Sequence, residues 1–182
     1  DKLTKELKRK IFDNIKIMKR EKSSFLSNLV LILTGPSGTG KSFLIKYLLH
    51  KIKMHTFVCS TPFYDTDLLK FNELIIIENI DLRKAIFYSL LYDVKLERWE
   101  KLKGKIFLFS CHKIEKESKI YGEICNNFGI PQVINLNYPD KETKSEYIKS
   151  ILNKSNINLP EDFIDFIIRN KEIRTFVDIK EI

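Results

Sequence analysis

Residues 31 to 44 read LILTGPSGTGKSFL, and this stretch decides the fold. It begins inside an unbroken apolar run from Leu29 to Leu33, which has the length of a strand buried on both faces. The run leads into the complete pattern G-x-x-x-x-G-K-[ST], formed by Gly35, Pro36, Ser37, Gly38, Thr39, Gly40, Lys41 and Ser42. Apolar residues then recur at positions 44, 45, 48, 49 and 52, which predicts a helix. Strand, loop and helix follow one another as a phosphate-binding loop requires.

The chemistry of this loop predicts a nucleotide site. Glycines let backbone N–H groups turn toward phosphate oxygens, because a Cβ would obstruct the approach or forbid the dihedrals. In such a loop Lys41 reaches the β- and γ-phosphates, and the Ser42 hydroxyl binds Mg²⁺. The following helix adds the positive end of its dipole. We therefore predict that residues 35 to 43, ending at Phe43, bind ATP or ADP with Mg²⁺; a glycine-rich turn with a chance lysine is the alternative.

Length and composition set the class of protein. A chain of 182 residues with 43% hydrophobic residues suits one α/β domain with a small appendage. The net charge of +8 permits contact with nucleic acid or another polyanion, and a solvated basic surface explains it equally well. The three cysteines lack metal-ligand spacing, which predicts reduced thiols and a cytoplasmic location. No apolar run approaches the ~18 residues of a membrane helix, so no membrane partner is expected.

The remaining sequence alternates between strand and helix patterns. Strands are predicted at residues 56–59, 74–77, 105–109 and 133–136, helices at 82–96 and 113–127, and loop and turn at 61–71. Such alternation predicts a parallel sheet with helices on both faces and ligands at the carboxyl ends of the strands.

Three units are expected along the chain. A basic amphipathic helix at residues 2–20 lies in an N-terminal unit, residues 1–24. The nucleotide-binding α/β domain covers residues 25–137. A helical lid covers residues 138–182, with helices at 141–152, 160–168 and 173–182.

The second nucleotide element is LIIIENID, residues 74 to 81. In P-loop ATPases a buried strand ends in an acid that orders the Mg²⁺ shell, and Glu78 holds that place, where aspartate is usual. A second acid normally follows as the general base, but here the residue is Asn79, which has no basic lone pair. Asp81 is a candidate substitute. We therefore expect slow or absent hydrolysis. The alternative interpretation of residues 74–81 is an ordinary core strand that ends in polar residues.

The order of these motifs resembles a known family. GPSGTGKS, IIIENID, a strand ending FLFSCHK, and a helical segment that opens NYPDKETKSEYIKSIL and closes KEIRTFVDI are similar to the AAA+ ATPases, and most to the DnaA, Hda and helicase-loader group. The resemblance covers residues 25 to 182. It implies a nucleotide-dependent switch in DNA replication initiation or its regulation. It also implies other replication proteins or AAA+ subunits as partners, and DNA contact through the basic surface.

The resemblance also assigns roles to single residues. It implies that Ser110 is the polar sensor of the γ-phosphate, with His112 close behind it. It implies that Arg174, at the start of the last lid helix, is the sensor arginine of the lid. A surface charge on a terminal helix is the alternative role of Arg174.

One family feature is missing. Members place an arginine before the final strand that reaches the neighbouring subunit's ATP site, yet this chain has no arginine between Arg98 and Arg169. Asn126 and Asn127 stand in the matching region, and Lys119 is a point charge without the guanidinium fork. Such an arginine contributes ~10³ to 10⁵ in rate, so its absence also predicts weak hydrolysis.

Two other functions remain open on the sequence. GPSGTGKS is close to the loop of guanylate-kinase-like enzymes, but these usually continue with a second hydroxyl residue, where Phe43 stands here. Phosphoryl transfer to a small acceptor would also require a basic cluster that the middle of the chain lacks. The second alternative is a degenerate ATPase that serves as a scaffold in a replication or clamp-loader-type assembly, stabilised by its nucleotide.

Overall fold

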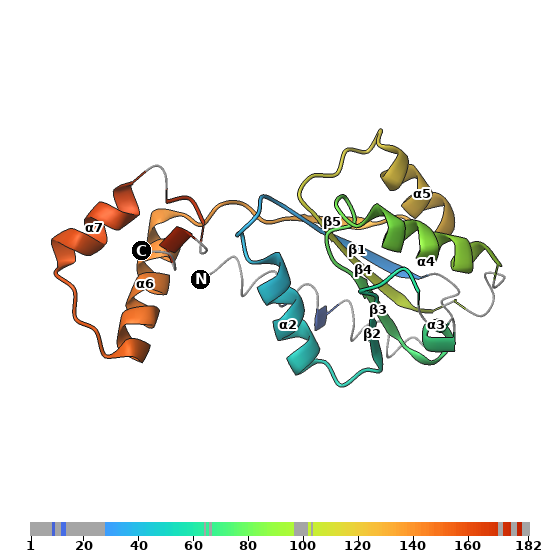
Figure 1. The fold of residues 1–182 in the computed structure, drawn as a ribbon, viewed down its shortest axis with the longest axis horizontal. Coiled ribbons are helices and arrows are strands. Elements are labelled where there is room, and N and C mark those ends of the chain that lie inside the picture. Colours follow the sequence, from blue (N-terminus) through green and yellow to red (C-terminus); the bar gives the residue numbers. More distant parts are fainter. Residues whose placement is uncertain are drawn as a thin grey trace.

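The computed structural model of the chain describes residues 9, 12–13, 28–63, 65, 67–96, 102, 104–170, 173–175 and 178–179. Strands and helices alternate up to residue 135, and two helices follow (Figure 1). In chain order the elements are β1 (Leu29–Thr34), α2 (Lys41–Lys51), β2 (Thr56–Val58), α3 (Asp67–Phe71), β3 (Leu74–Ile77), α4 (Lys84–Leu96), β4 (Ile106–Cys111), α5 (Lys119–Asn127), β5 (Gln132–Asn135), α6 (Lys141–Ser155) and α7 (Glu161–Arg169).

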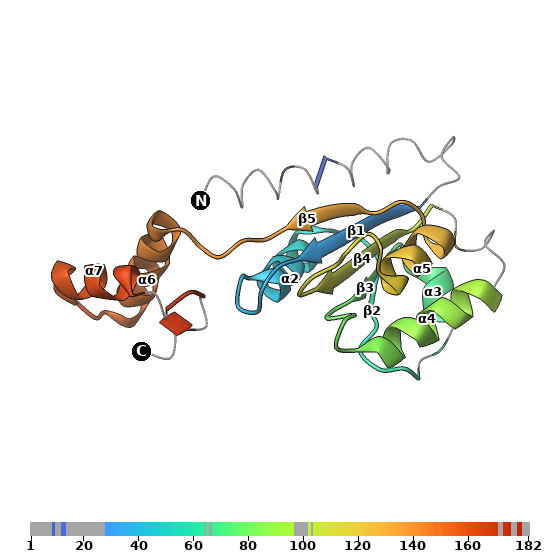
Figure 2. The same cartoon turned by 90° about the horizontal axis from the view of Figure 1, so that it is seen from above.

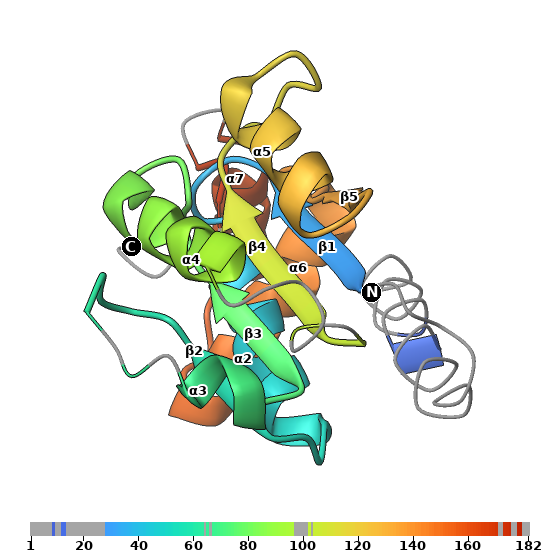
Figure 3. The same ribbon diagram turned by 90° about the vertical axis from the view of Figure 1, so that its right-hand side faces the viewer.

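The five strands form one sheet in the order β2-β3-β4-β1-β5, and every pair is parallel (Figure 3). All six residues of β4 and all four of β3 are buried, as are five of the six in β1. Strands covered on both faces read as continuous apolar runs, which is why these three segments are recognisable in the sequence. The predicted parallel α/β sheet is confirmed.

Alternate side chains of each strand face different helices. Leu31 and Leu33 pack in a cluster with α2, whereas Val30 and Ile32 pack in a cluster with α4 and α5. Because side chains alternate along a strand, Ser110 shares the α2 face with the residue two before it, and its neighbour Cys111 shares the face of α4 and α5. The phosphate loop therefore lies at the carboxyl edge of the sheet, on the side that Ser110 faces.

The C-terminal helices have a small core of their own. The buried residues of this core are Ile148 in α6, Ile164 and Ile167 in α7, and Ile173 and Ile179 in the segment that follows. Helices α6 and α7 lie beyond the carboxyl ends of the strands, on the side to which β1 and β5 point (Figure 2). Among the described residues after α7, only 178 and 179 are helical, so the predicted helix at 173–182 begins later than expected. The division into three units stays a prediction.

Three further sequence predictions are corrected. The segment 61–71, predicted as loop and turn, contains the short helix α3. Strand β4 continues beyond residue 109 to Cys111, because its neighbour β1 runs to Thr34 and pairs with it there. Helix α5 begins only at residue 119, since the Ser118 hydroxyl accepts the N–H of Tyr121 as an N-cap. Most of the predicted helix at 2–20 lies outside the described residues, and no described helix has the length and apolar character needed to cross a membrane.

Candidate functional site

The phosphate loop has backbone conformations that only glycine adopts readily. Gly35 has a φ of 151° and Gly38 a φ of 74°. A Cβ at Gly35 would lie 2.1 Å from the carbonyl oxygen of Leu136, a backbone atom that cannot withdraw. A Cβ at Gly38 would lie 2.5 Å from the Cβ of Thr175, a residue of the C-terminal segment. Both positions therefore require glycine, because the backbone has a positive φ and because Leu136 and Thr175 leave no room for a Cβ.

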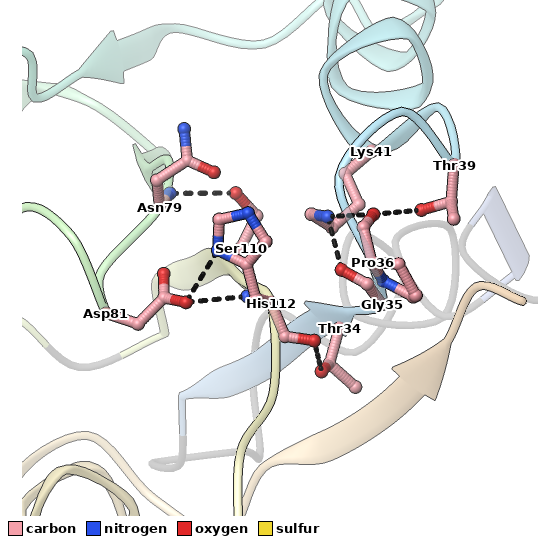
Figure 4. Close-up of polar contacts among 9 residues, drawn as sticks. All are labelled: Thr34, Gly35, Pro36, Thr39, Lys41, Asn79, Asp81, Ser110 and His112. Atoms are coloured by element: carbon pink, nitrogen blue, oxygen red, sulfur yellow. Dashed lines mark hydrogen bonds and ion pairs between the residues drawn. The ribbon is translucent and has the colours of Figure 1, made fainter. Parts of the chain in front are cut away.

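Lys41 is held inside this loop. Its ammonium group donates to the carbonyl oxygens of Gly35 and Pro36, the second at 2.8 Å, and the hydroxyl of Thr39 also donates to Pro36 at 2.9 Å (Figure 4). Burial lowers the pKa of Lys41 below its usual range. A buried ammonium that donates to neutral carbonyl oxygens gains from an anion placed nearby. The loop therefore presents a positive charge where a polyphosphate would lie.

Ser42 and Glu78 meet across the site. The Ser42 hydroxyl, at the start of α2, donates to the Oε2 atom of Glu78, just after β3, at 2.5 Å. The two residues are 36 positions apart in the sequence, and only the fold brings them together. A hydroxyl and a carboxylate are hard oxygen donors of the kind Mg²⁺ takes when phosphates supply its other ligands. These two residues fit Mg²⁺ with a bound nucleotide. Phe43, next along α2, is 68% exposed.

Asn79 occupies a left-handed conformation with a φ of 56°. Asparagine and aspartate adopt this region more readily than other non-glycine residues. The N–H of Asn79 donates to the hydroxyl oxygen of Ser110 at 3.0 Å, and Ser110 is fully buried. Ser110 therefore ties the end of β4 to the turn after β3. Any contact of Ser110 with a phosphate oxygen would use its hydroxyl hydrogen, because phosphate oxygens accept hydrogen bonds and the O–H is the one donor of a serine side chain.

Asp81 is turned toward the end of β4. Its Oδ2 atom accepts from the backbone N–H of His112 at 2.9 Å and lies 2.8 Å from that residue's Nδ1 atom (Figure 4). Burial alone would raise the pKa of Asp81, but these hydrogen bonds outweigh it and hold the pKa below its usual range. Its Oδ1 atom is buried with no partner among the described residues. In this arrangement one oxygen of the carboxylate is engaged at the end of β4.

His112 links the two halves of the site through its backbone. Its carbonyl oxygen accepts from the N–H of Gly35 at 3.0 Å and from the hydroxyl of Thr34 at 3.1 Å. The same residue donates to Asp81, so the entrance of the phosphate loop and the turn after β3 are joined through the end of β4. The sequence places His112 near the site but does not predict this role, because any residue type can form hydrogen bonds through its backbone carbonyl.

Arg174 lies in the segment that contacts the phosphate loop. Its N–H donates to the Oδ2 atom of Asp178 at 2.8 Å, and its neighbour Thr175 packs against Gly38. Sequence reasoning identified Arg174 but missed Thr175 and Asp178. The pattern Thr-x-x-Asp at residues 175–178 is a capping-box signal that could have found them.

The region where the family resemblance expects an arginine for a neighbouring subunit contains Lys119, Asn126 and Asn127 instead. Asn127 donates from Nδ2 to the carbonyl oxygen and Oε2 of Glu123, at 2.8 and 3.0 Å, so its amide is engaged within α5. The Lys119 ammonium lies 6.0 Å from the ring centroid of Tyr88. Asn126 is exposed but carries no charge. No guanidinium belongs to this helix.

Comparison of the sequence with family models and with curated proteins finds no match. The structure, in contrast, is similar to solved replication proteins. A DNA replication initiation factor matches with a TM-score of 0.65 and 14% identity over 95% of this chain and 58% of its own. The replication initiator DnaA bound to AMPPCP and single-stranded DNA matches with 0.61 and 14%, over 91% and 57%. Domain III of DnaA from Thermotoga maritima matches with 0.59 and 16%, over 86% and 72%.

These likenesses define the fold. The parallel five-stranded sheet with its flanking helices is the DnaA-like AAA+ fold. The chain spans less than two thirds of the length of the first two structures it matches.

Proposed function

We propose that this protein binds ATP or ADP with Mg²⁺ and acts as a nucleotide-dependent switch in DNA replication initiation or its regulation. The observation that carries the proposal is the 2.5 Å contact between Ser42 and Glu78 beside a glycine-lined loop that holds Lys41. Phosphate, metal and loop lysine would then meet at one point. The similar DnaA structure with AMPPCP supports the same chemistry. Bound Mg²⁺ would neutralise phosphate charge and fix the phosphate geometry.

Hydrolysis in this proposal is weak. Asn79 holds the position of the general base but cannot accept a proton, and both oxygens of Asp81 are occupied or buried. The chain also offers no arginine to a neighbouring site from α5. ATP would therefore remain intact for long periods, and the switch would depend on which nucleotide is bound rather than on fast turnover.

The C-terminal helices would read the bound nucleotide as a lid. Arg174 would contact the γ-phosphate from the lid and Ser110 from the sheet, so that ATP and ADP favour different lid positions. The packing of Thr175 on Gly38 supports this coupling, because a change in the conformation of the loop at Gly38 would displace the neighbouring lid segment.

The proposed partners follow from charge and from the similar structures. One similar protein carries single-stranded DNA, and the net charge of +8 suits contact with phosphates. We propose other replication proteins or AAA+ subunits as partners, DNA contact through the basic surface, and a cytoplasmic location.

Isothermal titration calorimetry with ATP and ADP, with and without Mg²⁺, tests the binding. We expect Glu78→Gln and Ser42→Ala to reduce the Mg²⁺ dependence of ATP binding, and the exposed Glu117→Gln to leave it unchanged. A folded chain that binds neither nucleotide would refute the proposal. A turnover assay with single-stranded DNA then separates the alternatives, since phosphate transfer only to an added acceptor would indicate a kinase. Nucleotide affinity that neither DNA nor a partner alters would indicate a scaffold.

A further inference from the structure

The peptide bond between Ile173 and Arg174 is held at both ends by opposite charges. The Lys144 ammonium, from α6, donates to the carbonyl oxygen of Ile173. The Asp178 carboxylate accepts from the N–H of Arg174 at 2.8 Å. This carbonyl and this N–H belong to the same peptide unit, whose dipole is negative at the oxygen and positive at the hydrogen. A cation at one end and an anion at the other favour a single orientation of the unit.

The Lys144 side chain is buried against this peptide bond and is largely shielded from solvent. Lysine is rarely buried, yet Lys144 is only 9% exposed. Burying an ammonium group is unfavourable unless it has partners, and here these are the carbonyl of Ile173 and the nearby charge of Asp178. Hydrogen bonds from the backbone N–H groups of Thr175 and Arg174 hold the pKa of Asp178 below its usual range. The carboxylate of Asp178 is therefore charged at neutral pH. Lys144 and Asp178 together form a clamp on this peptide unit.

The clamp continues to the phosphate loop through Thr175. Asp178 also accepts the N–H of Thr175 at 2.7 Å, and the Thr175 hydroxyl accepts the N–H of Asp178 at 3.3 Å. This reciprocal pair fixes Thr175, whose side chain lies against Gly38. Arg174 is the residue directly before Thr175, so its Cα is fixed next to the point where the C-terminal segment meets the loop.

We propose that Lys144 and Asp178 are positioning residues, which orient Arg174 toward the γ-phosphate of a bound nucleotide without touching the nucleotide themselves. The inference rests on the proposed function, because it takes Arg174 as the group that distinguishes ATP from ADP. An arginine whose backbone is already fixed loses less conformational freedom when it contacts a phosphate. The clamp thus contributes to discrimination between the two nucleotides and not to binding of their shared diphosphate.

The measurement is the ratio of the ADP and ATP dissociation constants, from calorimetry on the full chain with Mg²⁺. A charge-assisted contact to the γ-phosphate corresponds to a ratio of about 10 or more in the unmodified chain. We expect Arg174→Ala to bring the ratio close to one. We expect Lys144→Met to lower it about as much, with ADP affinity within about twofold of the unmodified chain. The double variant should lower it no further.

Three controls separate positioning from general damage. Lys149→Met removes an exposed lysine from the same helix and should leave the ratio unchanged. Lys144→Arg restores a cation and should recover part of the ratio. Asp178→Asn tests the other end of the clamp and keeps the proposal open to refutation if Lys144→Met does not fold.

The outcomes distinguish this inference from the proposed function. If the unmodified chain binds neither nucleotide, the proposed function fails. If Arg174→Ala abolishes discrimination while Lys144→Met and Asp178→Asn preserve it, the proposed function stands and the clamp is refuted. Equal loss of ATP and ADP affinity in the clamp variants, or an effect of Lys149→Met of the same size, would also refute it.

Discussion

Replacing Gly38 with alanine should destabilise the protein in two separable ways. At a φ of 74° an alanine pays the left-handed penalty, about 1–2 kcal/mol. The new Cβ would also lie 2.5 Å from the Cβ of Thr175, whereas two carbon atoms prefer about 3.5 Å or more. Crowding of this kind typically costs about 1–3 kcal/mol. The expected loss in the free energy of unfolding is therefore about 2–5 kcal/mol.

A second substitution separates the two effects. The three atoms nearest to the new Cβ all belong to the Thr175 side chain, so Thr175→Gly removes these close contacts and leaves the backbone strain. The Thr175 hydroxyl accepts the N–H of Asp178 as an N-cap would, but glycine replaces such a cap at a loss of only a few tenths of a kcal/mol. In the Gly38→Ala/Thr175→Gly chain we expect about 1–3 kcal/mol of the loss to return.

Equilibrium urea unfolding of the four chains, without nucleotide, measures this coupling. Gly122→Ala is the matched control, because Gly122 lies in α5 with nothing within 4 Å of the added Cβ, and alanine there should be neutral or stabilising. Strictly additive effects of the two substitutions would show that Thr175 does not contact Gly38 in solution. The placement of the C-terminal segment on the phosphate loop, and the inferences built on it, would then be wrong.

Other predictions test single residues. Asn79→Asp keeps a residue that tolerates a φ of 56°, and together with Asn127→Arg it should raise ATP turnover; unchanged phosphate release, with folding and affinity intact, would contradict both assignments. The lowered pKa of Asp81 stabilises the fold above about pH 4, and this contribution is lost as the pH falls through the folded-state pKa. Urea unfolding of Asp81→Asn should therefore differ from the unmodified chain more at pH 7 than at pH 3, and an equal difference at both would contradict this. Burial raises the pKa of Cys59 and Cys111 to about 11, so a thiol reagent at pH 8 should modify the half-buried Cys125 first. Equal rates of modification at all three cysteines, measured before denaturation, would contradict this.

The parts of the fold that the sequence predicts are those with local signals. Buried parallel strands are continuous apolar runs, so β3 was placed residue for residue and β1 to within one residue. The phosphate loop has a fixed spacing, and each of its glycines has a positive φ. Glu78 was identified because it follows a buried strand, and the fold sets it against Ser42.

What the sequence does not predict are contacts between distant segments. Helix α3 is only five residues long, too short for a periodic pattern. The pairing of Asp81 with His112 depends on two strand ends meeting at one edge of the sheet. Lys144 reads as one more surface lysine on a polar helix, and its burial becomes visible only when the Ile173 segment is folded over it. Local pattern carries no information about such partners.

The strand order also constrains how the molecule folds. Strand β1 has no partner among the next two strands of the chain, since Leu29 pairs with Ile106 and Leu31 with Gln132. Pairings of such long sequence separation form slowly, because the intervening chain must first be ordered. On the ribosome, the strand that leads into the phosphate loop stays without either neighbour until residues beyond 105 have emerged. Nucleotide therefore cannot assist the early steps of folding, and its stabilising effect is confined to the last ones.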